Sequence, residues 1–120
     1  MPPAFSPQSK EDIAQAVISC LKVSPKGDCS NGPHGPIGEW GVSNITNMDK
    51  IFDGARSFNF DVSKWDVSSG TTMSAMFVRA ASFNGDLSKW DVSNVVDMSA
   101  MFASATSFNG AILKWDVSSV

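Results

Sequence analysis

Few side chains in this sequence could carry acid-base, nucleophilic or metal chemistry. It holds one histidine, His34, and two cysteines, Cys20 and Cys29. A catalytic triad would have to use His34, which lies in a Gly-Pro-His-Gly-Pro turn, and no nucleophile elbow surrounds any serine. One histidine and two cysteines are too few ligands for a zinc site of the common Cys/His type. We therefore interpret His34 as a surface-loop residue and expect no enzyme activity, no metal and no cofactor.

Charged and hydroxyl side chains at a fixed spacing are the better candidates for binding. They form rows of lysine, aspartate and serine: Lys64, Lys89 and Lys114; Asp66, Asp91 and Asp116; Ser68 and Ser93. One interpretation is that the lysine and aspartate rows neutralise each other as weak exposed pairs. The other is an acidic ladder that takes up calcium or a basic partner, but no dense acidic loop supplies the six to eight oxygen ligands of calcium. We favour the first interpretation and keep these rows as the candidate binding surface.

Length and composition limit the classes of protein that remain. At 120 residues, 42% hydrophobic and 18% charged, the chain has the size and apolar content of one folded domain. The 12 acidic residues outnumber the 9 basic ones, which argues against a nucleic-acid or anionic-membrane partner. No apolar run is long enough for membrane insertion, and no signal peptide is visible, so a signal is either absent or already removed.

An internal repeat of 25 residues is the strongest pattern, because every tryptophan obeys it. The tryptophans are Trp40, Trp65, Trp90 and Trp115. Four further rows run in step with them: Met48, Met73 and Met98; Phe52, Phe77 and Phe102; Phe58, Phe83 and Phe108; Asn59, Asn84 and Asn109. The repeats therefore span 40–64, 65–89 and 90–114, with a partial repeat at 115–120.

This period predicts a repeat solenoid of the leucine-rich-repeat kind, with one short parallel β-strand in each 25-residue coil. The two-residue gap between Trp90 and Val92 favours a strand, whereas the three-residue gaps on either side favour turns or polyproline-like segments. Stacked coils would turn the Trp, Met and Phe rows into ladders through the core. The Asn row would lie at the bends, where side-chain amides satisfy backbone groups.

The first 39 residues lack the repeat. Residues 1–8 are rich in proline, and we expect them to be disordered. Residues 9–39 then contain a helix over 10–22, with Ser9 as its N-cap and its end before Pro25, followed by a linker rich in Gly and Pro. Since repeat proteins need their terminal cores covered, the helix is interpreted as an N-terminal cap. Cys20 and Cys29 either form a disulfide or remain two unpaired thiols.

The repeats resemble the BspA-like leucine-rich-repeat family, in the branch found in mycoplasma lipoproteins. The resemblance lies in Ser-Phe-Asn-Gly-Asp-Leu-Ser-Lys-Trp followed by Trp-Asp-Val-Ser-Asn-Val-Val-Asp-Met-Ser-Ala-Met-Phe, and it covers residues 37–120. It implies a secreted or surface protein that acts in adhesion or protein binding without enzyme activity. The extracellular setting that it implies favours the disulfide between Cys20 and Cys29.

Two functions remain open. The first is a binding or adhesion module that presents its Lys, Asp and Ser rows to a protein or a glycan. The alternative is an assembly element that associates end to end, because the partial repeat leaves Trp115 and Val117 uncovered. A chain that is a fragment of a longer array explains the same uncovered end, and we favour that explanation.

Overall fold

The computed structural model describes residues 5–109, 112 and 115–120. Helix α1 spans Lys10–Val23. It begins where Ser9 Oγ accepts a hydrogen bond from the Asp12 N–H (3.1 Å), which satisfies one of the free donors of the first turn. It ends where the Ser24 N–H donates to the Cys20 carbonyl, next to Pro25. The helix predicted over 10–22 is thus confirmed, with one further residue at its C-terminus.

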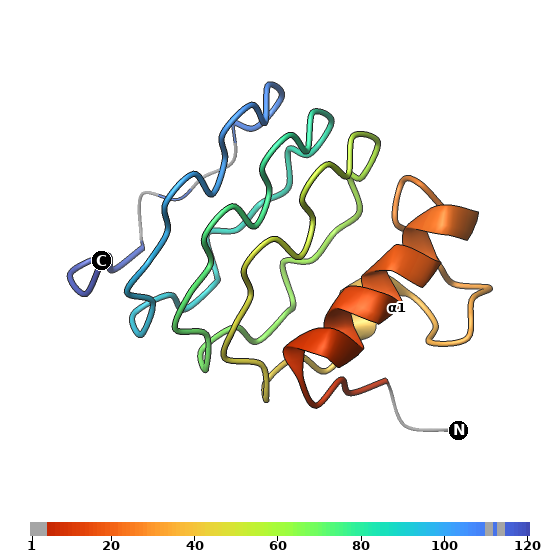
Figure 1. Ribbon diagram of the computed structural model, residues 1–120, viewed down its shortest axis with the longest axis horizontal. Coiled ribbons are helices and arrows are strands. Elements are labelled where there is room, and N and C mark those ends of the chain that lie inside the picture. The colour runs from red at the N-terminus through yellow and green to blue at the C-terminus, as the bar shows by residue number, and fades with distance from the viewer. Residues whose placement is uncertain (1–4, 110–111, 113–114) are drawn as a thin grey trace.

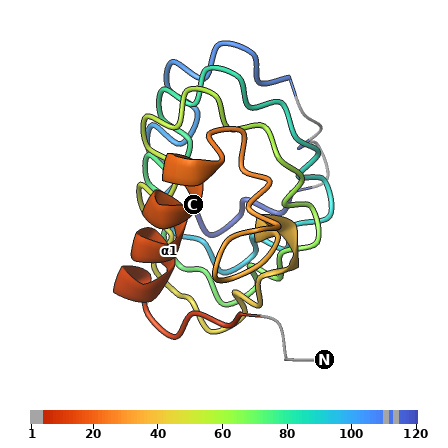
Figure 2. The same ribbon diagram turned by 90° about the vertical axis from the view of Figure 1, so that its right-hand side faces the viewer.

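After the helix, the chain winds through three repeat turns that lie side by side (Figure 1). We call residues 40–64, 65–89 and 90–109 the first, second and third repeat turn. Viewed along the long axis of the molecule, the turns superpose around a common interior, with α1 at the near end (Figure 2). The Cα radius of gyration is 13.3 Å, the size expected of a compact domain of this length.

Tight bends build each repeat turn, and their positions follow the apolar spacing. The Trp90 N–H donates to the Leu87 carbonyl (3.1 Å), and the Val95 N–H donates to the Val92 carbonyl (3.0 Å). Both bonds span three residues, so these three-residue gaps are turns, as predicted. The 3₁₀-helix η1, Ile37–Glu39, forms the equivalent bend before Trp40.

The predicted leucine-rich-repeat-like solenoid of parallel strands is wrong. Within the described ranges no strand or sheet forms, and strand-like pairing is limited to isolated parallel bridges from Thr72 to Asn47 and to Asp97. Trp90 and Val92 do point into the core, but residues 90–92 exchange no backbone hydrogen bonds with a neighbouring turn. Left-handed residues also interrupt every turn, and such residues break an extended backbone. They are Lys50 and Gly54, Ala75 and Arg79, and Ala100 and Ser104.

Backbone hydrogen bonds at alternate residues join neighbouring turns without forming a sheet. In the second turn, the N–H groups of Met73 and Ala75 donate to the carbonyls of Asp97 and Ser99 (2.9 and 2.8 Å). The intervening Ser74 N–H donates to Asp49 Oδ1 of the first turn (2.7 Å), whereas the Met76 N–H bonds within its own turn, to the Met73 carbonyl. Each turn therefore satisfies its backbone partly by itself and partly through its neighbour.

Aromatic columns fill the interior in register with the repeat. Phe77 stacks between Phe52 and Phe102, with ring centroids 5.3 and 5.6 Å apart. A second column contains Phe83 between Phe58 and Phe108, at 5.6 and 5.8 Å. Met48 and Met73 are fully buried, while Met98 is half-buried. The rings of the first two turns are buried and those of Phe102 and Phe108 half-buried, and their stacking adds to the burial of apolar surface.

Tryptophan and asparagine side chains link one turn to the next by hydrogen bonds. The indole Nε1–H groups of Trp65, Trp90 and Trp115 each donate to a carbonyl 28 residues earlier, at 2.7 to 3.0 Å. Trp40 donates instead to carbonyls of the linker. On the surface, the Oδ1 of Asn59 accepts from the Asn84 N–H (2.9 Å), and the Oδ1 of Asn84 accepts from the Asn109 N–H (2.7 Å).

The N-terminal segment covers one end of the stack, at the right of Figure 1. Helix α1 buries Ile13, Ala16, Val17 and Cys20 in the same core as the repeats. A disulfide joins Cys20 to Cys29, whose Cα atoms lie 5.5 Å apart. The loop that it closes includes Gly27 at φ +99°, where an added Cβ would lie 2.5 Å from the Phe58 ring. Glycine at this position therefore lets the loop lie against the end of an aromatic column.

Residues 5–8 fall in the segment expected to be disordered, yet they make defined contacts. The Phe5 carbonyl accepts a hydrogen bond from the Gly41 N–H (2.8 Å), and Pro7 is buried. Asn44 Nδ2 donates to Gln8 Oε1 (3.2 Å). These contacts hold the strap of residues 5–8 across the first turn; residues 1–4 lie outside the described part.

Candidate functional site

Each Trp-Asp-Val-Ser segment of the later repeats bends its aspartate back onto the serine two residues further on. Asp66 Oδ1 accepts from the N–H and the Oγ of Ser68, at 3.0 and 2.6 Å. Asp91 and Ser93 repeat both distances. Such turns form because a short carboxylate side chain reaches the backbone two residues on. The aspartate and serine rows of the candidate binding surface are therefore held in a fixed orientation.

The same turn recurs at aspartates that the sequence analysis left out of the surface. Asp61, Asp86 and Asp97 accept from the N–H groups of Ser63, Ser88 and Ser99, at 2.8, 2.9 and 2.9 Å. The signal that marks them is an Asp-x-Ser triplet, which is visible in the sequence. We call the charged set formed by Asp61, Lys64, Asp66, Asp86, Lys89, Asp91 and Asp116 the acidic surface.

Serine hydrogen bonds lower the pKa of four aspartates of the acidic surface, which are Asp61, Asp66, Asp91 and Asp116. The side chain and the N–H of Ser68 hold the pKa of the Asp66 carboxyl below its ordinary value of 3.8, against the repulsion of Asp91. Ser63 lowers the pKa of Asp61 in the same way, and the Lys64 ammonium adds to the effect. The charge of Asp116 opposes the lowered pKa of Asp91, which Ser93 maintains. Hydrogen bonds to the charged form thus outweigh the repulsion between neighbouring turns.

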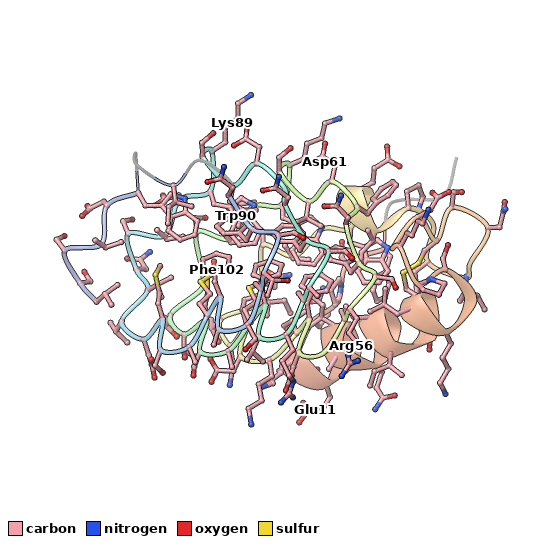
Figure 3. The ribbon with its side chains drawn as sticks, turned by 90° about the horizontal axis from the view of Figure 1, so that it is seen from above. Glu11, Arg56, Asp61, Lys89, Trp90 and Phe102 are labelled. Atoms are coloured by element: carbon pink, nitrogen blue, oxygen red, sulfur yellow. A yellow bond between two sulfur atoms is a disulfide. The ribbon has the colours of Figure 1, made fainter. Side chains whose placement is uncertain are left out.

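Direct pairing between the lysine and aspartate rows, which the sequence analysis favoured, is not observed among those members that the structure describes. The ion pair found in the described residues joins Arg79 to Asp53 (2.8 Å), away from these rows. Lys64 and Lys89 are exposed, and Lys114 lies outside the described ranges. Figure 3 shows Asp61 and Lys89 on one side of the molecule, with Trp90 and Phe102 between them and the opposite side. In the described residues, Asp66 and Asp91 use Oδ1 for their serine turns, and Oδ2 of each stays available to a partner.

A family model described as a Mycoplasma protein of unknown function, DUF285, matches residues 27–120. This match spans the disulfide-closed linker from Gly27 onward, η1, and every repeat. The chain belongs to the DUF285 family. Searches of curated proteins and of solved structures found no match. Helix α1 lies outside the DUF285 match, whereas the whole acidic surface lies inside it.

The histidine and the two cysteines of this DUF285 chain take part in packing and cross-linking. His34 stacks on Phe5 with ring centroids 3.8 Å apart, and Trp40 meets both rings edge-on. The two cysteine sulfurs are consumed in the disulfide. Over residues 5–109, 112 and 115–120, no three His, Cys, Asp or Glu side chains are grouped as metal ligands. In the same part of the chain, no helix is both long and apolar enough to span a bilayer.

The opposite side of this DUF285 chain carries charges of both signs. Arg56 and Glu11 lie there, across the molecule from Asp61 and Lys89 (Figure 3). Arg56 follows the Asp53 that pairs with Arg79, and Lys22 lies near Arg56 along the same groove.

Proposed function

We propose that this DUF285 chain is a non-enzymatic binding module of a surface or secreted protein, and that its acidic surface binds a basic segment of a partner protein. The observation that carries the proposal is the set of Asp-x-Ser turns, which hold aspartates in a fixed orientation, in register from turn to turn. The equivalent phenylalanine rings lie 5.3 to 5.8 Å apart, so charges of like sign recur at about that interval. A regular row of carboxylates attracts Lys and Arg side chains and steers their association.

The type of repeat and the cellular location belong to the same proposal. We place the chain with the BspA-like surface proteins because its repeats carry that family's phenylalanine, asparagine and tryptophan positions. The disulfide supports an oxidising compartment, since cytosolic thiols are kept reduced. A glycan in place of the basic protein segment is the other partner that exposed Asp, Lys and Ser rows could serve.

The test compares a charge-neutral variant of the acidic surface with a matched control. The probe is a fluorescently labelled octa-lysine peptide, followed by anisotropy at low salt. We expect D66N/D91N to weaken binding several-fold, because Asn keeps the turn-forming oxygen and removes the charge. D28N changes one exposed aspartate of the linker and should leave affinity unchanged. Equal affinity of all three proteins for the peptide contradicts the proposal.

We propose end-to-end association as the second candidate function. It is supported by the N–H groups of Ala100, Phe102 and Ser104, which find no acceptor in the described ranges, whereas their equivalents in earlier turns donate to the next turn. Val117 is 50% exposed, although its equivalent Val92 is 1% exposed. Another turn with matching carbonyls, in the same chain or another one, would satisfy these groups. Light scattering should then show mass rising with concentration, and a constant monomer mass excludes this candidate.

A further inference from the structure

A groove of about 400 Å³ separates the C-terminal half of α1 from the first repeat turn. Ile18, Leu21 and Lys22 line its helix side, and Gly54, Ala55 and Arg56 are among the residues on its other side. Ile18 is 50% exposed, an unusual fraction for a large apolar side chain on a helix that packs its other face into the core. The groove thus offers apolar side chains on its helix side and the volume of a pocket for a small ligand or a short peptide.

Two cations at this groove lack a counter-charge. Lys22 and Arg56 are exposed, and the side chains of both are without an ion pair or hydrogen bond in the described part of the chain. Asp53, which also lines the groove, accepts from Arg79 at 2.8 Å and is neutralised by it. The net charge around the groove is therefore positive, unlike that of the acidic surface.

We propose that this groove binds a short acidic peptide segment of a partner protein. An apolar side chain of the peptide would lie on Ile18 and Leu21, and flanking carboxylates would reach Lys22 and Arg56. A guanidinium donates two parallel hydrogen bonds to a carboxylate, which gives both affinity and direction. Gly54 has no Cβ, and an added Cβ there would have no neighbour within 4 Å, so the peptide backbone has open access to this wall.

The charge count favours a peptide over an anionic lipid surface. Polybasic segments that bind anionic membranes bring about four to eight Lys or Arg residues together. Here the free cations at the groove are Lys22 and Arg56, and the molecule as a whole carries a formal charge of -3. The site is also on the side of Arg56, across the molecule from Asp61 and Lys89 (Figure 3), so it is distinct from the acidic surface of the proposed function.

The experiment selects peptides and then asks which surface holds them. Seven-residue peptides displayed on phage are selected on the full chain, and the enriched sequence is synthesised with a fluorescent label. We expect enrichment of acidic peptides with one or two apolar residues. K22E/R56E should weaken binding of that peptide by about tenfold or more, and I18S by several-fold.

The control makes the same change of charge elsewhere. K64E/K89E alters the acidic surface and should leave the affinity for the selected peptide within about twofold. The milder pair K22Q/R56Q, checked by its urea midpoint, separates loss of binding from loss of folding. Absence of acidic peptides after selection, or equal binding by K22E/R56E, overturns the proposal. Binding to phosphatidylserine vesicles that depends on Lys22 and Arg56, without peptide binding, overturns it in favour of a lipid surface. None of these results affects the D66N/D91N test of the acidic surface.

Discussion

Left-handed residues set a conformational cost at fixed positions of the repeat turns. Gly54 (φ +72°) holds the place that Arg79 (φ +59°) and Ser104 (φ +58°) hold in the later turns. In this region a residue with a Cβ costs about 1 to 2 kcal/mol, whereas glycine adopts it freely. The first turn avoids this cost at one of its two left-handed positions, and the later turns do not.

Ser104→Gly should therefore stabilise the protein. Ser104 is exposed, so little packing is lost, and we expect the free energy of unfolding to rise by about 0.5 to 1 kcal/mol in urea titrations. Ala103→Gly is the control, because Ala103 is also exposed and is not left-handed. The free energy of unfolding of that variant should fall by a similar amount, because glycine gives the unfolded chain more conformational freedom. A decrease of stability in both variants contradicts the explanation.

Acid should destabilise the fold through the Asp-x-Ser turns. Asp61, Asp66 and Asp91 have pKa values below the ordinary 3.8. For a lowered pKa, the stabilisation is complete above the unfolded pKa and is lost as the pH falls through the folded one. The urea midpoint should thus drop as the pH falls from about 5 to about 2. The urea midpoint should fall less steeply with pH in D66N/D91N than in the wild-type protein. An identical dependence on pH in both proteins would falsify the role of these carboxylates.

At the scale of single residues, the sequence predicts a turn where a side chain itself forms the turn's hydrogen bonds. The Asp-x-Ser triplets mark their own turns, because a carboxylate and a nearby N–H are enough to form one. Ala75 and Ala100 carry no such mark, although both are left-handed. They stand one and two periods after the left-handed Lys50, so the conformation follows the place in the turn, and single-residue preferences do not contain that information.

At the scale of elements, local signals determined the helix and misled on the strands. Ser9 and Pro25 delimit α1 from within its own segment, so its bounds could be read directly. The alternation at Trp90, Asp91 and Val92 indicated a strand, and the side chains do alternate between core and solvent. Such alternation indicates only an extended backbone, whereas a strand also needs a hydrogen-bonded neighbour. Here the tight bends on both sides form hydrogen bonds within the turn instead.

The disulfide should contribute substantially to the stability of the protein, through the N-terminal end that it cross-links. It closes a loop of sequence separation 9, and constraining such a loop in the unfolded chain is worth about 2 to 3 kcal/mol. C20A/C29A should lower the free energy of unfolding by about this amount, measured in urea without reductant. S19A/S30A, at exposed neighbouring positions, should change it little. A reduced wild-type protein that unfolds at the oxidised midpoint contradicts the prediction.

At the scale of the whole molecule, three kinds of contact share one register. Phenylalanine columns, asparagine links and indole hydrogen bonds all join residues at a constant offset between turns. The 25-residue period of the sequence predicted this register and the side-chain contacts that follow from it. It did not predict the conformation of the backbone, which forms bends in place of strands. A shift of one residue disturbs all three kinds of contact at once.

Removal of one whole repeat should leave a folded protein. Deleting 65–89 joins Lys64 to Trp90, which reproduces the native Lys-Trp junction and lets Trp90 donate to the Ile37 carbonyl in place of Trp65. We expect cooperative urea unfolding, with a lower free energy of unfolding and a weaker dependence of that free energy on urea concentration. The near-ultraviolet circular dichroism of the tryptophans should be preserved. Deleting 65–88 removes one residue fewer and should abolish that signal. A folded product in both cases contradicts the shared register.

The constant register also bears on how genes for such chains can change in length. Gain or loss of one codon within a repeat disturbs the phenylalanine columns, the asparagine links and the indole hydrogen bonds together, so selection removes it. Unequal recombination between neighbouring repeats adds or removes a complete unit and restores every contact. Length variants of this coding sequence are therefore expected to differ by whole repeats, with each crossover point free to fall anywhere along the repeat.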